Sequence, residues 1–137
     1  MSRNIQVAID CRDPHTLNRF WAEVMEYEVE DHHDLIEQLM AGGLVTEADT
    51  ISIAGRRAFA TAAACRDSSG HGRLLFQQVP EDKVVKNRVH LDVHADDRDA
   101  LVARCLELGA TKLWDGHQGP ETWVTLADPE GNEFCIS

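Results

Sequence analysis

In the first quarter of the chain, the spacing of apolar residues changes from every second position to every third or fourth position. Residues 5–11 carry apolar side chains at every second position, which predicts a strand with two chemically different faces. Asp13 then offers a capping carboxylate, and Pro14 suits the first position of a helix. Residues 17–25 place apolar side chains at three- and four-residue steps, which predicts an amphipathic helix packed on a sheet. A second strand is expected over residues 27–30.

The middle of the chain predicts an additional helix and three strands. Apolar positions at helical spacing indicate an inserted helix at about residues 33–41, which Gly42-Gly43 would end. Residues 51–54 and 58–65 have the composition of strands joined at Gly55. Another strand is expected over residues 74–79, after a turn rich in Asp, Ser and Gly.

The second half repeats the opening pattern. Residues 89–93 again alternate, and Asp96-Asp97 precedes a stretch of helical spacing that ends at Gly109. Strands are expected over the three segments that follow, which are residues 111–115, 122–127 and 133–137. The turn at 128–131 (Asp-Pro-Glu-Gly) resembles the one at 67–70 (Asp-Ser-Ser-Gly).

A constant shift of 84 residues, the difference between the numbers of Gln6 and His90, superimposes the two halves. Under this shift Leu17 falls on Leu101 and strand, helix and next strand stay in register. The sequence therefore predicts an α+β fold in which two βαβββ modules in tandem form a curved mixed sheet with a cleft. The modules span about residues 3–80 and 86–137 of a single domain.

Composition narrows the classes of function. The chain has 137 residues, 43% of them hydrophobic and 27% charged, as is ordinary for one globular domain. It shows neither a signal-peptide pattern nor a long apolar run, so we expect a cytoplasmic protein without a membrane partner. The net charge of −11 argues against nucleic acid as a partner. The four dispersed cysteines are expected to be buried thiols.

Candidate cleft residues are the polar members of otherwise apolar strands. The first strand of each half contributes three positions, and the later strands contribute further polar and aromatic side chains. The resulting set is Gln6, Ala8 and Asp10; His90, Asp92 and His94; Phe76, Gln77 and Cys135; and Glu121, Trp123 and Thr125. The segment 116–120 is a candidate mobile loop from which His117 would reach a ligand, with a plain hairpin as the default interpretation.

Three segments carry a family resemblance. They are Asp13 to Trp21 (DPHTLNRFW), Lys86 to Asp97 (KNRVHLDVHADD) and Trp123 to Ser137 (WVTLADPEGNEFCIS). In this order and spacing they resemble the vicinal-oxygen-chelate superfamily, which includes glyoxalases, extradiol dioxygenases, fosfomycin-resistance proteins and bleomycin-binding proteins. The tail and the segment before it are most similar to the bacterial glyoxalase-like subgroup.

The resemblance implies four metal-ligand positions, here Gln6, Gln77, His90 and Cys135. Relatives place glutamates where this chain has Gln77 and Cys135, and neutral amides with one thiol do not replace the charge that holds a hard divalent cation. Imidazole and thiolate together suit zinc, but two strong ligands fall short of the three or four of a stable site. No metal cofactor is therefore expected.

Without a metal, catalysis would depend on side chains. His90 and Asp92 share one face of a strand, where a carboxylate can tune an imidazole as a general base, and Glu121 is a second acid–base candidate. Alternating polar residues are equally typical of a solvated strand face. The remaining candidates are expected to contact the ligand: Gln6, Asp10, Phe76, Gln77, His94, Trp123 and Cys135.

The sequence leaves two main functions open. A third interpretation is that the chain is a recognition module of a larger complex. The first is a lyase or isomerase in which His90 abstracts a proton next to a carbonyl group. The second is a metal-free protein that binds or sequesters a small molecule, as the bleomycin-resistance relatives do. In each case the expected partner is a small organic ligand, and the resemblance implies a homodimer.

Overall fold

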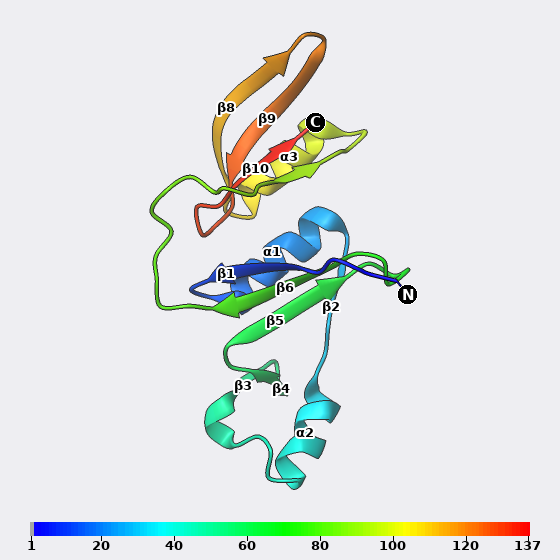
Figure 1. The fold of residues 1–137 in the computed structure, drawn as a ribbon, viewed down its shortest axis with the longest axis vertical. Coiled ribbons are helices and arrows are strands. Elements are labelled where there is room, and N and C mark those ends of the chain that lie inside the picture. The colour runs from blue at the N-terminus through cyan, green and yellow to red at the C-terminus, as the bar shows by residue number, and fades with distance from the viewer. Residues whose placement is uncertain (1) are drawn as a thin grey trace. The chain divides into compact units, whose positions relative to one another are not determined.

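The computed structural model describes residues 2–137, which form two compact units that divide between Pro80 and Glu81 (Figure 1). Each unit contains a mixed four-stranded sheet and a helix that follows the first strand of that sheet. The predicted α+β class is therefore confirmed. The two units are described separately below.

In the N-terminal unit, the main sheet has the order β1-β6-β5-β2. Its strands are β1 (Val7–Cys11), β2 (Glu28–Val29), β5 (Ala62–Arg66) and β6 (Arg73–Gln78). β1 and β6 are parallel, whereas β6 with β5 and β5 with β2 are antiparallel. Helix α1 (Pro14–Met25) follows β1 and packs on this sheet.

The C-terminal unit has the same topology. Its sheet has the order β7-β10-β9-β8, with strands β7 (Leu91–Val93), β8 (Thr111–Gln118), β9 (Glu121–Ala127) and β10 (Glu133–Ile136), and α3 (Arg98–Glu107) follows β7. β7 and β10 are parallel, and the other pairs are antiparallel. Identical strand order and direction in both units confirm the duplicated βαβββ plan.

The turns before β6 and β10 also match. The amide of Gly70 donates to the carbonyl oxygen of Asp67 at 3.2 Å, and the amide of Gly131 donates to that of Asp128 at 2.8 Å. Both glycines have positive φ, a conformation that a residue with a side chain rarely adopts. The similarity that the sequence suggests between these turns therefore reflects a shared backbone conformation.

An insertion without counterpart in the second half separates β2 from β5. It comprises α2 (His33–Ala41), a 3₁₀ turn η1 (Glu47–Asp49), and the two-stranded sheet of β3 (Thr50–Ile53) and β4 (Arg56–Phe59). Helix α2 occupies the segment in which the sequence predicts an inserted helix, and its C-cap is Gly42.

The single strand predicted over residues 58–65 is wrong, because the structure divides it into β4 and β5. The division follows from a change of hydrogen-bond partner. The amide of Ala60 donates to the carbonyl oxygen of Asp49 in the insertion, whereas the carbonyl of Thr61 accepts from the amide of Gln78 in the main sheet. The chain passes from one sheet to the other between these two residues.

Helix α1 provides much of the core of the N-terminal unit. The Asp13 side chain caps it by accepting from the backbone amide of Thr16 at 3.1 Å, as the sequence predicts. The buried helix face packs against the apolar face of the sheet, and Phe20 and Trp21 contact each other edge to face. Phe76 is fully buried among the core side chains, so its assignment as a ligand contact is wrong.

The C-terminal unit has a smaller core. Cys105 is the only residue of α3 that is buried, and Leu106 on the same helix is 43% exposed. On β8, Leu113 and Trp114 are 39% and 47% exposed. This helix and strand therefore leave apolar surface in contact with solvent.

The predicted loop over residues 116–120 is largely strand. β8 continues to Gln118, which pairs with Glu121 of β9, so only Gly119 and Pro120 form the turn. His117 pairs with Thr122 inside this hairpin and is exposed. The plain hairpin, rather than a mobile loop, is the observed structure.

Among residues 2–137, no helix combines the length and apolar character needed to cross a membrane.

Candidate functional site

A cavity of about 270 Å³ lies within the C-terminal unit. Most of the candidates that the predictions place in this half line it, whereas Thr125 and His117 do not. The lining residues are His90, Asp92, His94, Glu121, Thr122, Trp123, Cys135 and Ser137. The structure thus brings together side chains from β7, from β9 and from the segment that contains β10.

Strand geometry explains why these side chains converge. Successive side chains of a strand point to opposite faces. Asp92 of β7 therefore faces away from the side to which Leu91 and Val93 turn, and the alternation puts His90 and His94, which flank β7, on the same face as Asp92. Cys135 of β10 pairs with Asp92 on one side and with Thr125 of β9 on the other. Thr125, another cleft candidate, is buried and its hydroxyl lies 3.4 Å from the Cys135 thiol.

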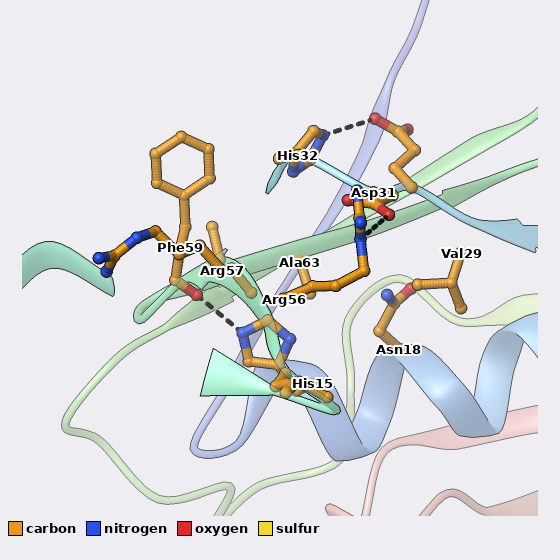
Figure 2. A pocket seen from close by; sticks show the side chains of 13 residues that line it. His15, Asn18, Val29, Asp31, His32, Arg56, Arg57, Phe59 and Ala63 are labelled. Carbon is orange, nitrogen blue, oxygen red and sulfur yellow. Dashed lines mark hydrogen bonds and ion pairs between the residues drawn. The ribbon is translucent and has the colours of Figure 1, made fainter. Parts of the chain in front are cut away.

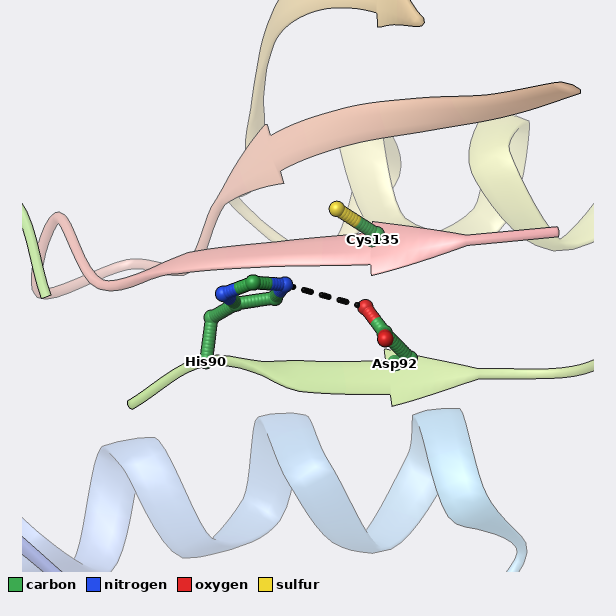
Figure 3. Close-up of side chains that lie close together, drawn as sticks. All are labelled: His90, Asp92 and Cys135. Carbon is green, nitrogen blue, oxygen red and sulfur yellow. Dashed lines mark ion pairs between the residues drawn. The ribbon is translucent and has the colours of Figure 1, made fainter. Parts of the chain in front are cut away.

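His90 and Asp92 form an ion pair at the cavity. Nε2 of His90 lies 3.2 Å from Oδ1 of Asp92, and the two side chains are 42% and 57% exposed (Figure 3). Figure 3 shows the other ring nitrogen of His90, Nδ1, turned away from Asp92. The pair therefore places an imidazole beside a carboxylate, with one ring nitrogen that Asp92 does not contact.

Cys135 places a third donor beside this pair. One ligand atom from each of His90, Asp92 and Cys135 lies within 4.8 Å of the others. Figure 3 shows Asp92 on β7, His90 just before this strand and Cys135 on the neighbouring β10. Imidazole nitrogen, thiolate sulfur and carboxylate oxygen are the three donor types found in zinc sites, and catalytic zinc sites use three protein ligands. The donor set therefore fits zinc. The expectation of no metal rested on two donors, because it did not include Asp92.

The opposite end of β7 is fixed by a separate contact. Nδ1 of His94 and the hydroxyl of Ser137 are 2.6 Å apart. Glu121, Thr122 and Trp123 come from the end of β9 that extends beyond its pairing with β10. The carboxylate of Glu121 and the indole of Trp123 therefore line the cavity from β9, and the His90–Asp92 pair lines it from β7 and the residue before it.

The N-terminal unit does not repeat this arrangement. By the 84-residue shift Asp92 corresponds to Ala8, and the strand register pairs Ala8 with Leu75 as it pairs Asp92 with Cys135. Leu75 is therefore the counterpart of Cys135, and the equivalence of Gln77 with Cys135 is wrong. Gln77 pairs with Asp10, two residues after the Ala8–Leu75 pair. The residue at the same place in the C-terminal unit, two residues after Cys135, is Ser137.

The other N-terminal candidates lie on the exposed face of their sheet. Asp10 and Gln77 are neighbours in register and both are exposed. The Gln6 side chain accepts a hydrogen bond from Nη1 of Arg73 at 2.6 Å. Arg73 in turn donates to Glu30 at 2.6 Å, and this bond is the main reason why the pKa of Glu30 is lowered. Gln6 is thus part of an ion-pair network.

Two cysteines have the properties of structural thiols. Cys65 and Cys105 are fully buried, and burial raises the pKa of each thiol to about 11. A thiol with so high a pKa is a poor nucleophile and a poor metal ligand at neutral pH. Cys135 is less buried and is the cysteine that lines the cavity.

Sequence reasoning missed a second cavity of about 280 Å³ within the N-terminal unit (Figure 2). It lies where the insertion meets α1, β2 and β5. Its lining includes His15, Asn18, His32, Arg56, Arg57 and Phe59. The one available signal was the insertion itself, which has no counterpart in the second half.

The sequence matches the Glyoxalase-like domain family over residues 6–137. The chain therefore belongs to this family, and with it to the vicinal-oxygen-chelate superfamily that the fold and the duplicated modules define. No curated protein matches the chain.

Solved structures support the fold at low sequence identity. The fosfomycin resistance protein FosX from Listeria monocytogenes, crystallised as a point mutant with Mn(II) and 1S,2S-dihydroxypropylphosphonic acid, has 8% identity and a TM-score of 0.64, with 99% of this chain and 91% of that chain covered. A glyoxalase family protein from Bacillus cereus has 14% identity and a TM-score of 0.63, covering 99% and 93%. The bleomycin-binding protein from Streptomyces verticillus, in complex with copper(II)-bleomycin, has 15% identity and a TM-score of 0.57, covering 100% and 98%.

Proposed function

We propose that the chain binds a small organic carbonyl compound in the C-terminal cavity and that His90 removes a proton from the carbon next to the carbonyl group. The observation that carries this proposal is the His90–Asp92 pair, 3.2 Å apart, in a cavity that Glu121 also lines. Proton removal of this kind is a step of lyase and isomerase reactions.

Each side chain has a distinct role in this mechanism. Nδ1 of His90 accepts the proton, and the carboxylate of Asp92 stabilises the imidazolium that forms. Glu121, which comes from a different strand, is a further group in the cavity that can exchange a proton, so it can return one at a different atom of the ligand. Trp123 supplies an apolar wall for the carbon skeleton.

Zinc is the proposed cofactor if the site holds one, because His90, Asp92 and Cys135 fit its preferred donors. A zinc ion held by these three residues would supply Lewis-acid polarisation of a carbonyl oxygen. His90 would then serve as a ligand, and Glu121 would be the proton acceptor among the lining residues. Metal content therefore distinguishes the two roles of His90.

Binding without turnover is the second candidate function. Two observations support a binding function: a bleomycin-binding protein is among the structural neighbours, and the side chains of His90 and Asp92 are exposed. In this case the same cavity holds the ligand, with Trp123 as the main apolar contact. His90 and Asp92 would then act only as hydrogen-bonding groups.

Hydrogen exchange at carbon tests the proposal without knowledge of the product. Hydroxyacetone and pyruvate, incubated with the protein in D₂O, are followed by proton NMR for loss of the signal from the carbon next to the carbonyl. We expect exchange faster than in buffer alone for at least one of these probes. Saturable binding of both probes without faster exchange would instead support the binding function.

We also propose that the protein forms a homodimer in solution, as the resemblance implies. Exposed apolar side chains of the C-terminal unit, including Leu106, Leu113 and Trp114, favour association with another surface. Light scattering coupled to size-exclusion chromatography measures the mass directly. A mass equal to the 15.3 kDa of one chain at all concentrations would contradict the dimer.

A further inference from the structure

The cavity of the N-terminal unit contains a buried polar atom without a partner. Asn18 is 2% exposed and lines this cavity, and its Oδ1 has no hydrogen-bond partner within the described part of the chain. Its Nδ2 donates to the carbonyl oxygen of Ala64 at 3.1 Å, which fixes the amide orientation, because a carbonyl cannot donate. Oδ1 is therefore a buried acceptor that lacks a donor, an arrangement that costs free energy unless a donor binds there.

Two histidines add acceptors to the same cavity. Nε2 of His15 lies 2.7 Å from the carbonyl oxygen of Phe59, and Nε2 of His32 lies 3.1 Å from Oε1 of Glu30 (Figure 2). Both partners can only accept, so each Nε2 carries the hydrogen. In the neutral form of each ring, Nδ1 is then an acceptor.

The charged residues around the cavity neutralise one another. Arg56 pairs with Asp31 at 2.6 Å, and Arg57 pairs with Glu37 and Glu47, each at 2.8 Å. Glu30 pairs with both Arg73 and His32, at 2.6 and 3.1 Å. No lining cation or carboxylate among residues 2–137 is therefore left to select a charged ligand.

The remaining lining is apolar and includes a ring. Phe59 and His32 lie with ring centroids 5.7 Å apart and planes tilted by 54°. Val29, Ile53, Ala58, Ala62 and Ala63 complete the apolar wall. A volume of about 280 Å³ is at the lower end for ligand pockets and suits a single substituted ring.

We propose that this cavity is a second small-molecule site, separate from the C-terminal cavity, for a neutral single-ring compound whose hydroxyl or amino donors face Asn18 Oδ1. The two cavities have no lining residue in common. The site depends on the insertion, because Ile53, Arg56 and Phe59 belong to its two-stranded sheet. It goes beyond the proposed function and does not depend on it.

Resorcinol and 1,3-dimethoxybenzene form a matched pair of probes, because they share the ring and only resorcinol has donors. Each is titrated into ¹⁵N-labelled full-length protein, and backbone amide shifts are followed by NMR. We expect saturable shifts at Asn18, Phe59 and Ala63, with an affinity for resorcinol at least about tenfold higher than for the dimethyl ether.

Two variants locate the site. Ala58→Leu places a larger side chain in the cavity and should weaken resorcinol binding by at least about tenfold. Ala8→Leu enlarges an exposed position of β1 in the same unit and should change the affinity by less than about twofold. Equal affinity for the two probes would overturn the proposal, as would shifts that do not saturate or resorcinol binding that Ala58→Leu leaves unchanged.

Discussion

The two units share one topology but differ in what their side chains do. The N-terminal unit buries Leu17, Phe20 and Trp21 of its helix, whereas the C-terminal unit buries only Cys105 of α3. In the positions where the C-terminal unit has Asp92 and Cys135, the N-terminal unit has Ala8 and Leu75. One copy of the module thus carries the larger core, while the other carries the titratable cluster.

This division shows what a duplicated module permits. Both copies must keep the strand pairing that defines the sheet, but that pairing uses backbone groups and constrains side chains only weakly. The exposed face of one copy can therefore lose its polar cluster without loss of the fold. The N-terminal unit instead contains an insertion whose residues line a cavity at a different place.

Matched leucines on the two helices test the difference in core size. Leu17 is fully buried, while its counterpart Leu101 is partly exposed. We expect Leu17→Ala to lower the free energy of unfolding by about 2–5 kcal/mol, and Leu101→Ala by about 1 kcal/mol. Urea denaturation followed by circular dichroism measures both. Equal losses would mean that α3 is as well packed as α1.

Replacement of His90 should have the largest effect on catalysis. His90→Gln removes the proton acceptor and should lower the rate of hydrogen exchange at carbon by at least about 100-fold, the usual contribution of a general base. His71→Gln, an exposed histidine in the turn before β6, is the matched control and should leave the rate unchanged. Retained exchange in His90→Gln would remove His90 from the mechanism.

The Glu30–Arg73 pair predicts a pH-dependent stability confined to the N-terminal unit. The hydrogen bond from Arg73 is the main cause of the lowered pKa of Glu30, so the folded state binds its proton less readily than the unfolded state. This contribution is therefore present above the ordinary pKa of 4.5 and is lost as pH falls through the lower folded value.

The variant Glu30→Gln should cost about 1–3 kcal/mol in the free energy of unfolding at pH 7, because the bond to Arg73 is charge-assisted. The difference from wild type should shrink as pH falls below 4.5 and through the lower folded pKa, because the wild-type carboxyl group then also becomes protonated. Glu28→Gln, an exposed position on β2, is the control. A difference that is independent of pH would show that the charge of Glu30 contributes nothing.

Zinc binding would distinguish the exposed face of the C-terminal sheet from that of the N-terminal sheet. If the three donors hold zinc, isothermal titration should give about one ion per chain, and Cys135→Ala should weaken binding by at least about tenfold. Gln77→Ala in the other unit should have no effect, because its register places it opposite Asp10 rather than in a cluster. Absence of zinc binding would leave His90 free to act as the base.

Local periodicity was sufficient for most of the fold. Alternation over residues 5–11 and 89–93 and helical spacing over 17–25 depend on residues that are close in sequence, and the constant shift only compares such local patterns between the two halves. The same alternation places His90, Asp92 and His94 on one face. It also places Phe76 and Gln77 on opposite faces, so the assignment of both to one ligand site could have been rejected from the sequence.

The tertiary structure decided which distant residues meet. The pairing of Cys135 with Asp92, the alignment of Gln77 with Asp10 and the division of residues 58–65 between two sheets all depend on strand register. In each of these cases the pairing joins segments that are far apart along the chain, so the pattern within one segment does not specify its partner residue. For the same reason, the buried acceptor of Asn18 became visible only when α1, β5 and the insertion were placed together.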